Sequence, residues 1–220
     1  MKTLYIVATP IGNLSDMSPR AVETLGCVGK IYAEDTRHTG QLLKHFGIET
    51  PLASYFEYNE QQRIPEVLRE LEERDVALVS DAGTPTVSDP GFKLVREAAK
   101  AGFAVVSIPG PSAALVALTS SGLPTDRFTF LGFLPKKESA ARKILEEVKD
   151  WRTTLIFYES PFRVEKILRL IMDVMGDRDV AVGRELTKVH EEIVRGKVSE
   201  VLEAGITCKG EFTIVVGSGG

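Results

Sequence analysis

Four loops rich in glycine, proline and acidic residues carry the side chains of this sequence whose types and spacing could bind a ligand or do chemistry. They are Thr9-Pro10-Ile11-Gly12-Asn13, Glu34-Asp35-Thr36-Arg37-His38-Thr39-Gly40, Asp81-Ala82-Gly83-Thr84-Pro85 and Pro109-Gly110-Pro111-Ser112-Ala113. Glycine and proline give such loops fixed, tight shapes in which backbone groups can approach a ligand closely. The sequence contains neither G-x-x-x-x-G-K-[ST] nor G-x-G-x-x-G, so we expect neither a nucleoside triphosphate nor a dinucleotide.

A cofactor without phosphate fits these loops better. S-adenosylmethionine carries an amine, a carboxylate, a ribose and a cationic sulfonium, which backbone groups and an occasional carboxylate can satisfy without a lysine clamp. Taken singly, each loop is more often plain turn chemistry, and Asp81 or Asp89 alone is more often a helix cap. The combination of four loops favours a binding site.

Each loop follows an apolar, β-branched run, and helix-period segments alternate with these runs, which predicts α/β architecture. We expect helices to begin at Pro19, with Ser18 as cap, and to span residues 39–45, 60–74, 91–100 and 113–120. The strands expected in the first half are Leu4–Ala8, Lys30–Ala33, Leu52–Ser54, Val76–Ser80 and Ala104–Ile108. Ligands of such sheets bind outside the carboxyl ends of the strands, where the four loops lie.

A second α/β pattern starts near residue 115. The expected domains are therefore 1–114, with a mostly parallel sheet, and 115–220, with a mixed sheet because the return from Arg184 to His190 is short. The strands expected in the second half are Phe128–Leu131, Thr153–Tyr158, Asp179–Arg184, Glu191–Arg195 and Phe212–Val216.

Composition limits the possible functions. The 220 residues include 43% hydrophobic and 26% charged residues, which is typical of a globular protein. A net charge of −4 argues against coating nucleic acid by bulk charge, so any RNA contact must be local. Residues 136–152 hold a basic stretch, although its spacing is more typical of a solvated helix face.

No apolar run could span a membrane, which predicts a cytoplasmic protein without membrane contact. Cys27 and Cys208 suggest neither a disulfide nor a zinc site, and we expect no metal.

Seven stretches together resemble the ribosomal RNA small subunit methyltransferase I family of the tetrapyrrole methylase superfamily. They are residues 4–14, 33–40, 79–85, 109–113, 157–160, 183–188 and 210–217. The chain departs from that family at Phe56-Glu57-Tyr58, where relatives carry a more His-rich stretch. The resemblance implies two α/β domains with S-adenosylmethionine in the cleft between them, and a homodimer. It also implies an activity, methyl transfer to the ribose 2′-hydroxyl of a cytidine in small-subunit (16S) ribosomal RNA, free or in the assembled subunit.

Carried over position by position, the resemblance also implies a set of cofactor-binding residues. They are Pro10, Asp81, Ala82, Gly83, Val87, Ser88, Asp89, Ser112, Ala113, Tyr158, Leu186 and Gly210. Two other functions fit the same sequence: methylation of a small tetrapyrrole by the same fold, and a ribosome assembly factor that keeps the cofactor but performs no chemistry.

A ribose hydroxyl is a poor acid, so a general base or a developing hydrogen bond should help its attack on the methyl group. The candidates are Asp35, His38 and Glu185. Histidine takes up protons near neutral pH, and Arg37 beside His38 could hold a phosphate, which favours this pair. The alternative is that Asp35 caps the following helix and that Arg37 pairs with it.

Overall fold

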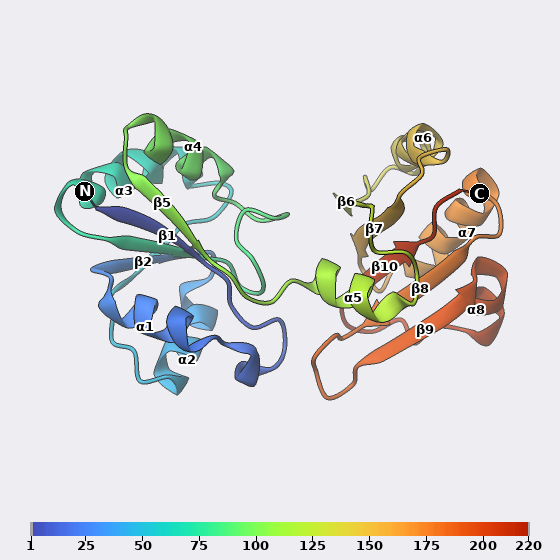
Figure 1. Ribbon diagram of the computed structural model, residues 1–220, viewed down its shortest axis with the longest axis horizontal. Helices are drawn as coiled ribbons and strands as arrows, with labels where there is room; N and C mark the ends of the chain where they lie inside the picture. Colours follow the sequence, from blue (N-terminus) through green and yellow to red (C-terminus); the bar gives the residue numbers. More distant parts are fainter. Residues whose placement is uncertain (1, 220) are drawn as a thin grey trace. The chain divides into compact units, whose positions relative to one another are not determined.

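The computed structural model describes residues 2–219, which form ten strands, eight α-helices and one 3₁₀ turn (Figure 1). The strands are β1 (Thr3–Val7), β2 (Lys30–Ala33), β3 (Leu52–Ser54), β4 (Val76–Val79), β5 (Ala104–Ile108), β6 (Phe128–Phe133), β7 (Thr154–Glu159), β8 (Asp179–Arg184), β9 (Glu192–Lys197) and β10 (Phe212–Val216). The helices are α1 (Pro19–Cys27), α2 (Thr36–His45), α3 (Glu60–Glu73), α4 (Phe92–Lys100), α5 (Ala113–Ser121), α6 (Glu138–Val148), α7 (Val164–Met175) and α8 (Val198–Ala204). None of these helices is long and apolar enough to cross a bilayer.

The described chain divides into two compact units that meet between Ser112 and Ala113. The first unit holds a fully parallel five-stranded sheet in the order β3-β2-β4-β1-β5. Helices α1 and α2 cover one face of this sheet, and α3 and α4 cover the other (Figure 1). Because both faces are buried, the central strand β4 reads as a continuous apolar run, Val76-Ala77-Leu78-Val79.

The second unit contains a mixed sheet in the order β6-β7-β10-β8-β9, in which only β6 and β7 run parallel. Its main core joins α6, α7 and α8 to alternate residues of the strands, such as Leu155 and Phe157 of β7 and Ile214 of β10. Helix α5 packs on β10 and β8. The hairpin from β8 to β9 is the short return that the sequence predicts after Arg184.

All ten predicted strands are confirmed to within two residues at each end. Among the helices, the one that the sequence predicts to begin at Thr39 begins at Thr36 instead, as α2. The Asp35 side chain accepts a hydrogen bond from the Arg37 backbone N–H, which caps the helix three residues earlier than expected. Residues 36–38, which the sequence places in a loop, are therefore the first turn of the helix.

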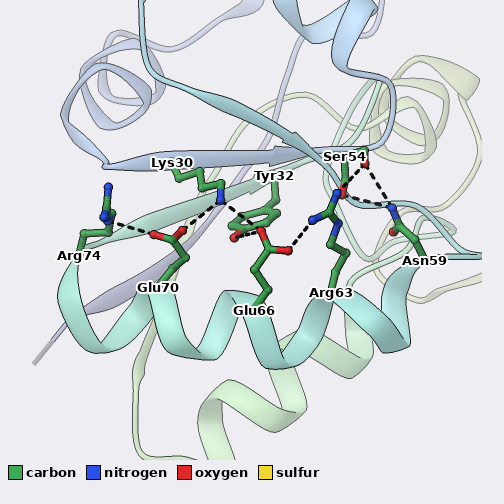
Figure 2. A network of polar contacts seen from close by, with 8 residues as sticks. All are labelled: Lys30, Tyr32, Ser54, Asn59, Arg63, Glu66, Glu70 and Arg74. Carbon is green, nitrogen blue, oxygen red and sulfur yellow. Dashed lines mark hydrogen bonds and ion pairs between the residues drawn. The ribbon is translucent and has the colours of Figure 1, made fainter.

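A network of ion pairs fixes α3 against β2 (Figure 2). The Lys30 ammonium lies 3.1 Å from a Glu66 carboxylate oxygen and 3.0 Å from one of Glu70. The buried Tyr32 hydroxyl donates to Glu66 at 3.2 Å, and burial raises the pKa of Tyr32 to about 12. At neutral pH the phenol therefore keeps its proton and remains a donor to the carboxylate.

Candidate functional site

The loops that follow β1, β4 and β5 are joined by hydrogen bonds at the carboxyl edge of the first sheet. Thr9 and Gly83 exchange two backbone hydrogen bonds of 2.9 and 3.0 Å, and the buried Thr9 hydroxyl donates to the Ser80 carbonyl at 3.3 Å. The Thr84 hydroxyl donates to the Pro111 carbonyl at 3.1 Å. Three segments far apart in the sequence thus form one rigid surface.

Gly110 permits the close approach of two of these segments. A Cβ atom at Gly110 would lie 2.9 Å from the Cβ of Ala8, closer than real Cβ contacts come. The turn of Pro109, Gly110 and Pro111 can therefore lie directly on the end of β1 only because position 110 has no side chain.

Three carboxylates gather at this edge: Glu34 at the end of β2, and Asp81 and Asp89 in the loop after β4. The Asp81 carboxylate accepts a hydrogen bond of 2.9 Å from the Asp35 backbone N–H, which ties the β4 loop to the start of α2. Burial and the nearby Asp89 and Asp81 charges raise the pKa of Glu34, and burial and Asp81 raise the pKa of Asp89. The cluster is an environment in which a bound cation would be stabilised.

The β4 loop also carries backbone strain. Thr86 and Ser88 adopt φ values of 73° and 67°, and Gly91 adopts 126°. A β-branched residue such as Thr86 rarely takes a positive φ, and such strain persists only where surrounding contacts hold it. Val87, between the two strained residues, exposes 39% of its surface.

Glu60, at the start of α3, provides one of those contacts. Its carboxylate is 6% exposed and accepts hydrogen bonds from the Gly91 backbone N–H at 3.0 Å and the Tyr55 hydroxyl at 3.1 Å. The Lys93 ammonium lies 2.8 Å from its second oxygen. Burial opposes ionisation of Glu60, but these partners together lower its pKa below the ordinary value. The charged carboxylate therefore fixes the end of the β4 loop.

The structure shows Asp35 and Arg37 in the alternative roles that the sequence allows, as a helix cap and its ion-pair partner. Besides capping α2, Asp35 forms a two-pronged ion pair with the Arg37 guanidinium, with N–O distances of 3.1 and 2.7 Å. These bonds hold the pKa of the Asp35 carboxyl well below its usual range, which weakens it as a base. His38 lies exposed in the first turn of α2, and its ring forms no hydrogen bond with any residue in the range 2–219.

The remaining predicted site residues lie in the second unit, at one edge of its sheet. Glu185, with φ 48°, accepts hydrogen bonds of 2.9 Å from both the Lys188 ammonium and the Glu211 backbone N–H. The Lys188 contact lowers the pKa of Glu185. Gly210 lies against Glu185, because a Cβ there would come within 2.4 Å of its carboxylate.

Leu186 and Tyr158 belong to the same edge. Leu186 is buried and packs against Gly183 at the end of β8. The Tyr158 ring, on β7, contacts those of Phe130 and Phe133 edge-on, with centroids 4.8 and 5.5 Å apart.

The structure thus sorts the predicted residues into two groups. In the first unit it brings together those of the acidic edge: Pro10, Asp81, Ala82, Gly83, Val87, Ser88, Asp89 and Ser112. In the second unit, Glu185, Leu186 and Gly210 adjoin, Tyr158 lies on a strand of the same sheet, and Ala113 begins α5. Within residues 2–219 no cluster of His, Cys, Asp or Glu is arranged to hold a metal ion.

The predicted binding and catalytic residues omit three residues of the first unit's edge, Glu34, Glu60 and Thr84, although Glu34 and Thr84 lie in two of the four candidate loops. Glu34 had a detectable signal, because two adjacent acidic residues follow a buried strand. The sequence gives no such signal for Glu60, because a glutamate in the first turn of a helix is commonly explained by its favourable interaction with the helix dipole.

Comparison with known proteins identifies a family, similar curated proteins and similar solved structures. The family described as tetrapyrrole (corrin/porphyrin) methylases matches residues 3–202. A protein of Halalkalibacterium halodurans called ribosomal RNA small subunit methyltransferase I is 49% identical over 99% of this chain and 76% of its own length. The protein of the same name from Escherichia coli O157:H7 is also 49% identical, over 97% of this chain and 77% of its own length.

Two solved structures share the fold at low identity. Uroporphyrin-III-C-methyltransferase from Thermus thermophilus superimposes with a TM-score of 0.68 at 17% identity, covering 99% of this chain and 94% of that one. Diphthine synthase superimposes with a TM-score of 0.75 at 11% identity, covering 99% and 90%. At these identities the likeness concerns the fold alone.

Proposed function

The chain belongs to the tetrapyrrole (corrin/porphyrin) methylase family and is a methyltransferase, and from this premise we propose that it methylates the ribose 2′-hydroxyl of a cytidine in small-subunit ribosomal RNA. The observation that carries the proposal is 49% identity, over nearly the whole chain, to proteins named for that ribosomal RNA. We also propose that it works as a homodimer in the cytoplasm.

The proposed methyl donor is S-adenosylmethionine, which supplies an electrophilic methyl group on a cationic sulfur when bound. The cluster of Glu34, Asp81 and Asp89 fits such a group, because burial and the neighbouring carboxylates raise the pKa values of Glu34 and Asp89, and a bound cation would stabilise their charged forms. The joined loops add backbone groups that are already fixed in place. We also propose that Tyr158, Leu186 and Gly210 bind the cofactor, because the family resemblance implies this role for them.

Among the proposed catalytic residues, we assign the proton-accepting role to His38. Asp35 is engaged by Arg37, and Glu185 by Lys188, and both contacts lower the carboxyl pKa. The His38 ring is exposed and so remains available to accept a proton from the ribose hydroxyl. Arg37, with 88% of its side chain exposed, would hold an adjacent phosphate.

The test is methyl transfer to isolated small ribosomal subunits. We expect release of S-adenosylhomocysteine and, by mass mapping of the ribosomal RNA, one added methyl group on a cytidine ribose. Tight cofactor binding without transfer to any RNA would contradict the proposal and favour an assembly factor. Transfer to a porphyrinoid but not to small subunits would favour a tetrapyrrole methyltransferase.

The raised pKa values predict how cofactor binding depends on pH. The folded protein binds protons at Glu34 and Asp89 more tightly than the unfolded chain, so ionising this pair costs stability above the ordinary pKa values of 4.5 and 3.8. As pH falls through the raised values, that cost disappears and the negative charge that attracts the cofactor is lost. We expect calorimetry to show weaker S-adenosylmethionine binding under these acidic conditions, and a flatter pH profile for Asp89→Asn. An identical profile for the variant would refute this explanation.

A further inference from the structure

The turn between β3 and α3 presents aromatic side chains to solvent. Tyr58 exposes 90% of its surface at the tip of this turn, and Phe56 exposes 37%. Glu57 lies between them, is exposed, and forms no ion pair with any of residues 2–219. Two aromatic rings and a free carboxylate therefore occupy three consecutive exposed positions.

Hydrogen bonds hold this turn in one shape. The Asn59 side-chain oxygen accepts from the Phe56 backbone N–H at 2.8 Å, and its amide nitrogen donates to the Ser54 carbonyl at 3.3 Å. The backbone N–H groups of Asn59 and Glu60 both donate to the Phe56 carbonyl at 3.0 Å. Tyr55, which is 1% exposed, anchors the start of the turn through its bond to Glu60.

The ion-pair network along α3 also contacts residues at both ends of this turn. Figure 2 shows Ser54 and Asn59 at one end of this network, which runs along α3 through Arg63 and Glu66. Arg63 donates to the Ser54 hydroxyl at 3.3 Å and pairs with the Glu66 carboxylate. The exposed rings thus stand on an ordered base, which reduces the entropy lost when a ligand contacts them.

The turn also lies beside the acidic edge of the first sheet. Its first residue, Tyr55, donates a backbone hydrogen bond of 2.7 Å to the Ala33 carbonyl, immediately before Glu34. The Glu57 charge contributes to the raised pKa of Glu34. A ligand that contacts Glu57 would therefore lie near Glu34, one of the carboxylates that we propose for the cofactor.

We infer that the turn of residues 56–58 recognises the unpaired cytosine base of the acceptor nucleotide, with Tyr58 stacking on the base and Glu57 accepting a hydrogen bond from its exocyclic amine. This inference rests on the proposed function. Stacking on exposed aromatic rings is the usual way in which proteins hold unpaired bases, and carboxylates accept from the cytosine amine. The carboxylates here would repel phosphate, so the turn suits a base better than the RNA backbone.

Three variants test the inference: Tyr58→Ala, Tyr58→Phe and Glu57→Gln. Phe162→Ala is the matched control, because Phe162 is a 94% exposed aromatic residue of the second unit. We expect Tyr58→Ala to raise KM for small subunits about tenfold, as base stacking on a single ring implies. Its cofactor Kd and Tm should equal those of the wild type, and Tyr58→Phe should restore most of the lost affinity. Glu57→Gln should raise KM severalfold, and Phe162→Ala should leave it unchanged.

Anisotropy with a labelled oligocytidylate provides a readout that does not require turnover. Weaker binding by Tyr58→Ala than by wild type and Phe162→Ala supports the base contact. Equal binding and equal KM for Tyr58→Ala would overturn it, and so would a dimer that dissociates on this substitution, since the turn would then be a protein contact. A wild type that binds the oligomer through Tyr58 but methylates no small subunit would refute the proposed function while supporting the base contact.

Discussion

Glu60→Ala is expected to lower the free energy of unfolding by about 2–4 kcal/mol, because a buried hydrogen-bond donor left without its acceptor costs about 1–3 kcal/mol and two donors are affected. The substitution leaves the Gly91 N–H and the Tyr55 hydroxyl without their acceptor and Lys93 without its counter-ion. Because Gly91 ends the strained β4 loop, cofactor affinity should fall together with stability. Urea denaturation and calorimetry measure the two effects.

Glu72→Ala is the control for this variant, because Glu72 is an exposed glutamate on the same helix. Exposed substitutions of this kind usually change stability by less than about 0.5 kcal/mol. Tyr55→Phe should fall between the two, with a loss of about 1 kcal/mol for one hydrogen bond. Wild-type stability in Glu60→Ala would contradict the proposed anchor.

The contribution of Glu60 to stability also has a defined dependence on pH. Its pKa in the folded protein is lower than in the unfolded chain, so the contribution is complete above the ordinary carboxyl pKa and is lost as pH falls through the folded value. The difference in stability between wild type and Glu60→Ala should therefore shrink in acid. The ionisation of Glu34 and Asp89, whose pKa values are raised, has the opposite effect and lowers the stability as pH rises.

The strands could be predicted because their signal is local. A run such as Val76-Ala77-Leu78-Val79 has few alternatives to a buried strand, and the turn residues on either side limit its length. The order of the strands in the sheet is not a local signal: β4 lies between β2 and β1 although it follows β3 in the chain. The start of α2 differs from the predicted one because the Asp35 cap makes the polar residues 36–38 helical.

Within the first unit, the residues of the candidate site that could be predicted are those that a loop motif marks. Asp81 and Gly83 belong to a Gly-Pro loop after a strand, so their positions could be read from the sequence. The anchor formed by Glu60 and Gly91 joins residues 31 positions apart and appears only when α3 packs beside α4. The same holds for the support of Tyr58, which depends on contacts from Ser54 and Arg63.

Asp81→Asn isolates the charge of the acidic edge from its geometry. Asparagine keeps a side-chain oxygen that can accept from the Asp35 N–H, so the start of α2 should remain in place. Removing one negative charge also relieves Glu34 and Asp89, and the Tm of the protein without cofactor should therefore stay equal or rise. A simple loss of structure would instead lower the Tm.

Affinity of Asp81→Asn for S-adenosylmethionine should fall about 10- to 100-fold, because a hydrogen bond or close contact between opposite charges contributes roughly 1.5–3 kcal/mol. Calorimetry measures this loss, and Asp16→Asn is the control, since it removes the same charge from an exposed position after β1. If Asp81→Asn bound the cofactor as tightly as the control, the cationic donor would not contact this cluster. If the affinity fell while the Tm held, the loss would come from the missing charge rather than from a displaced loop.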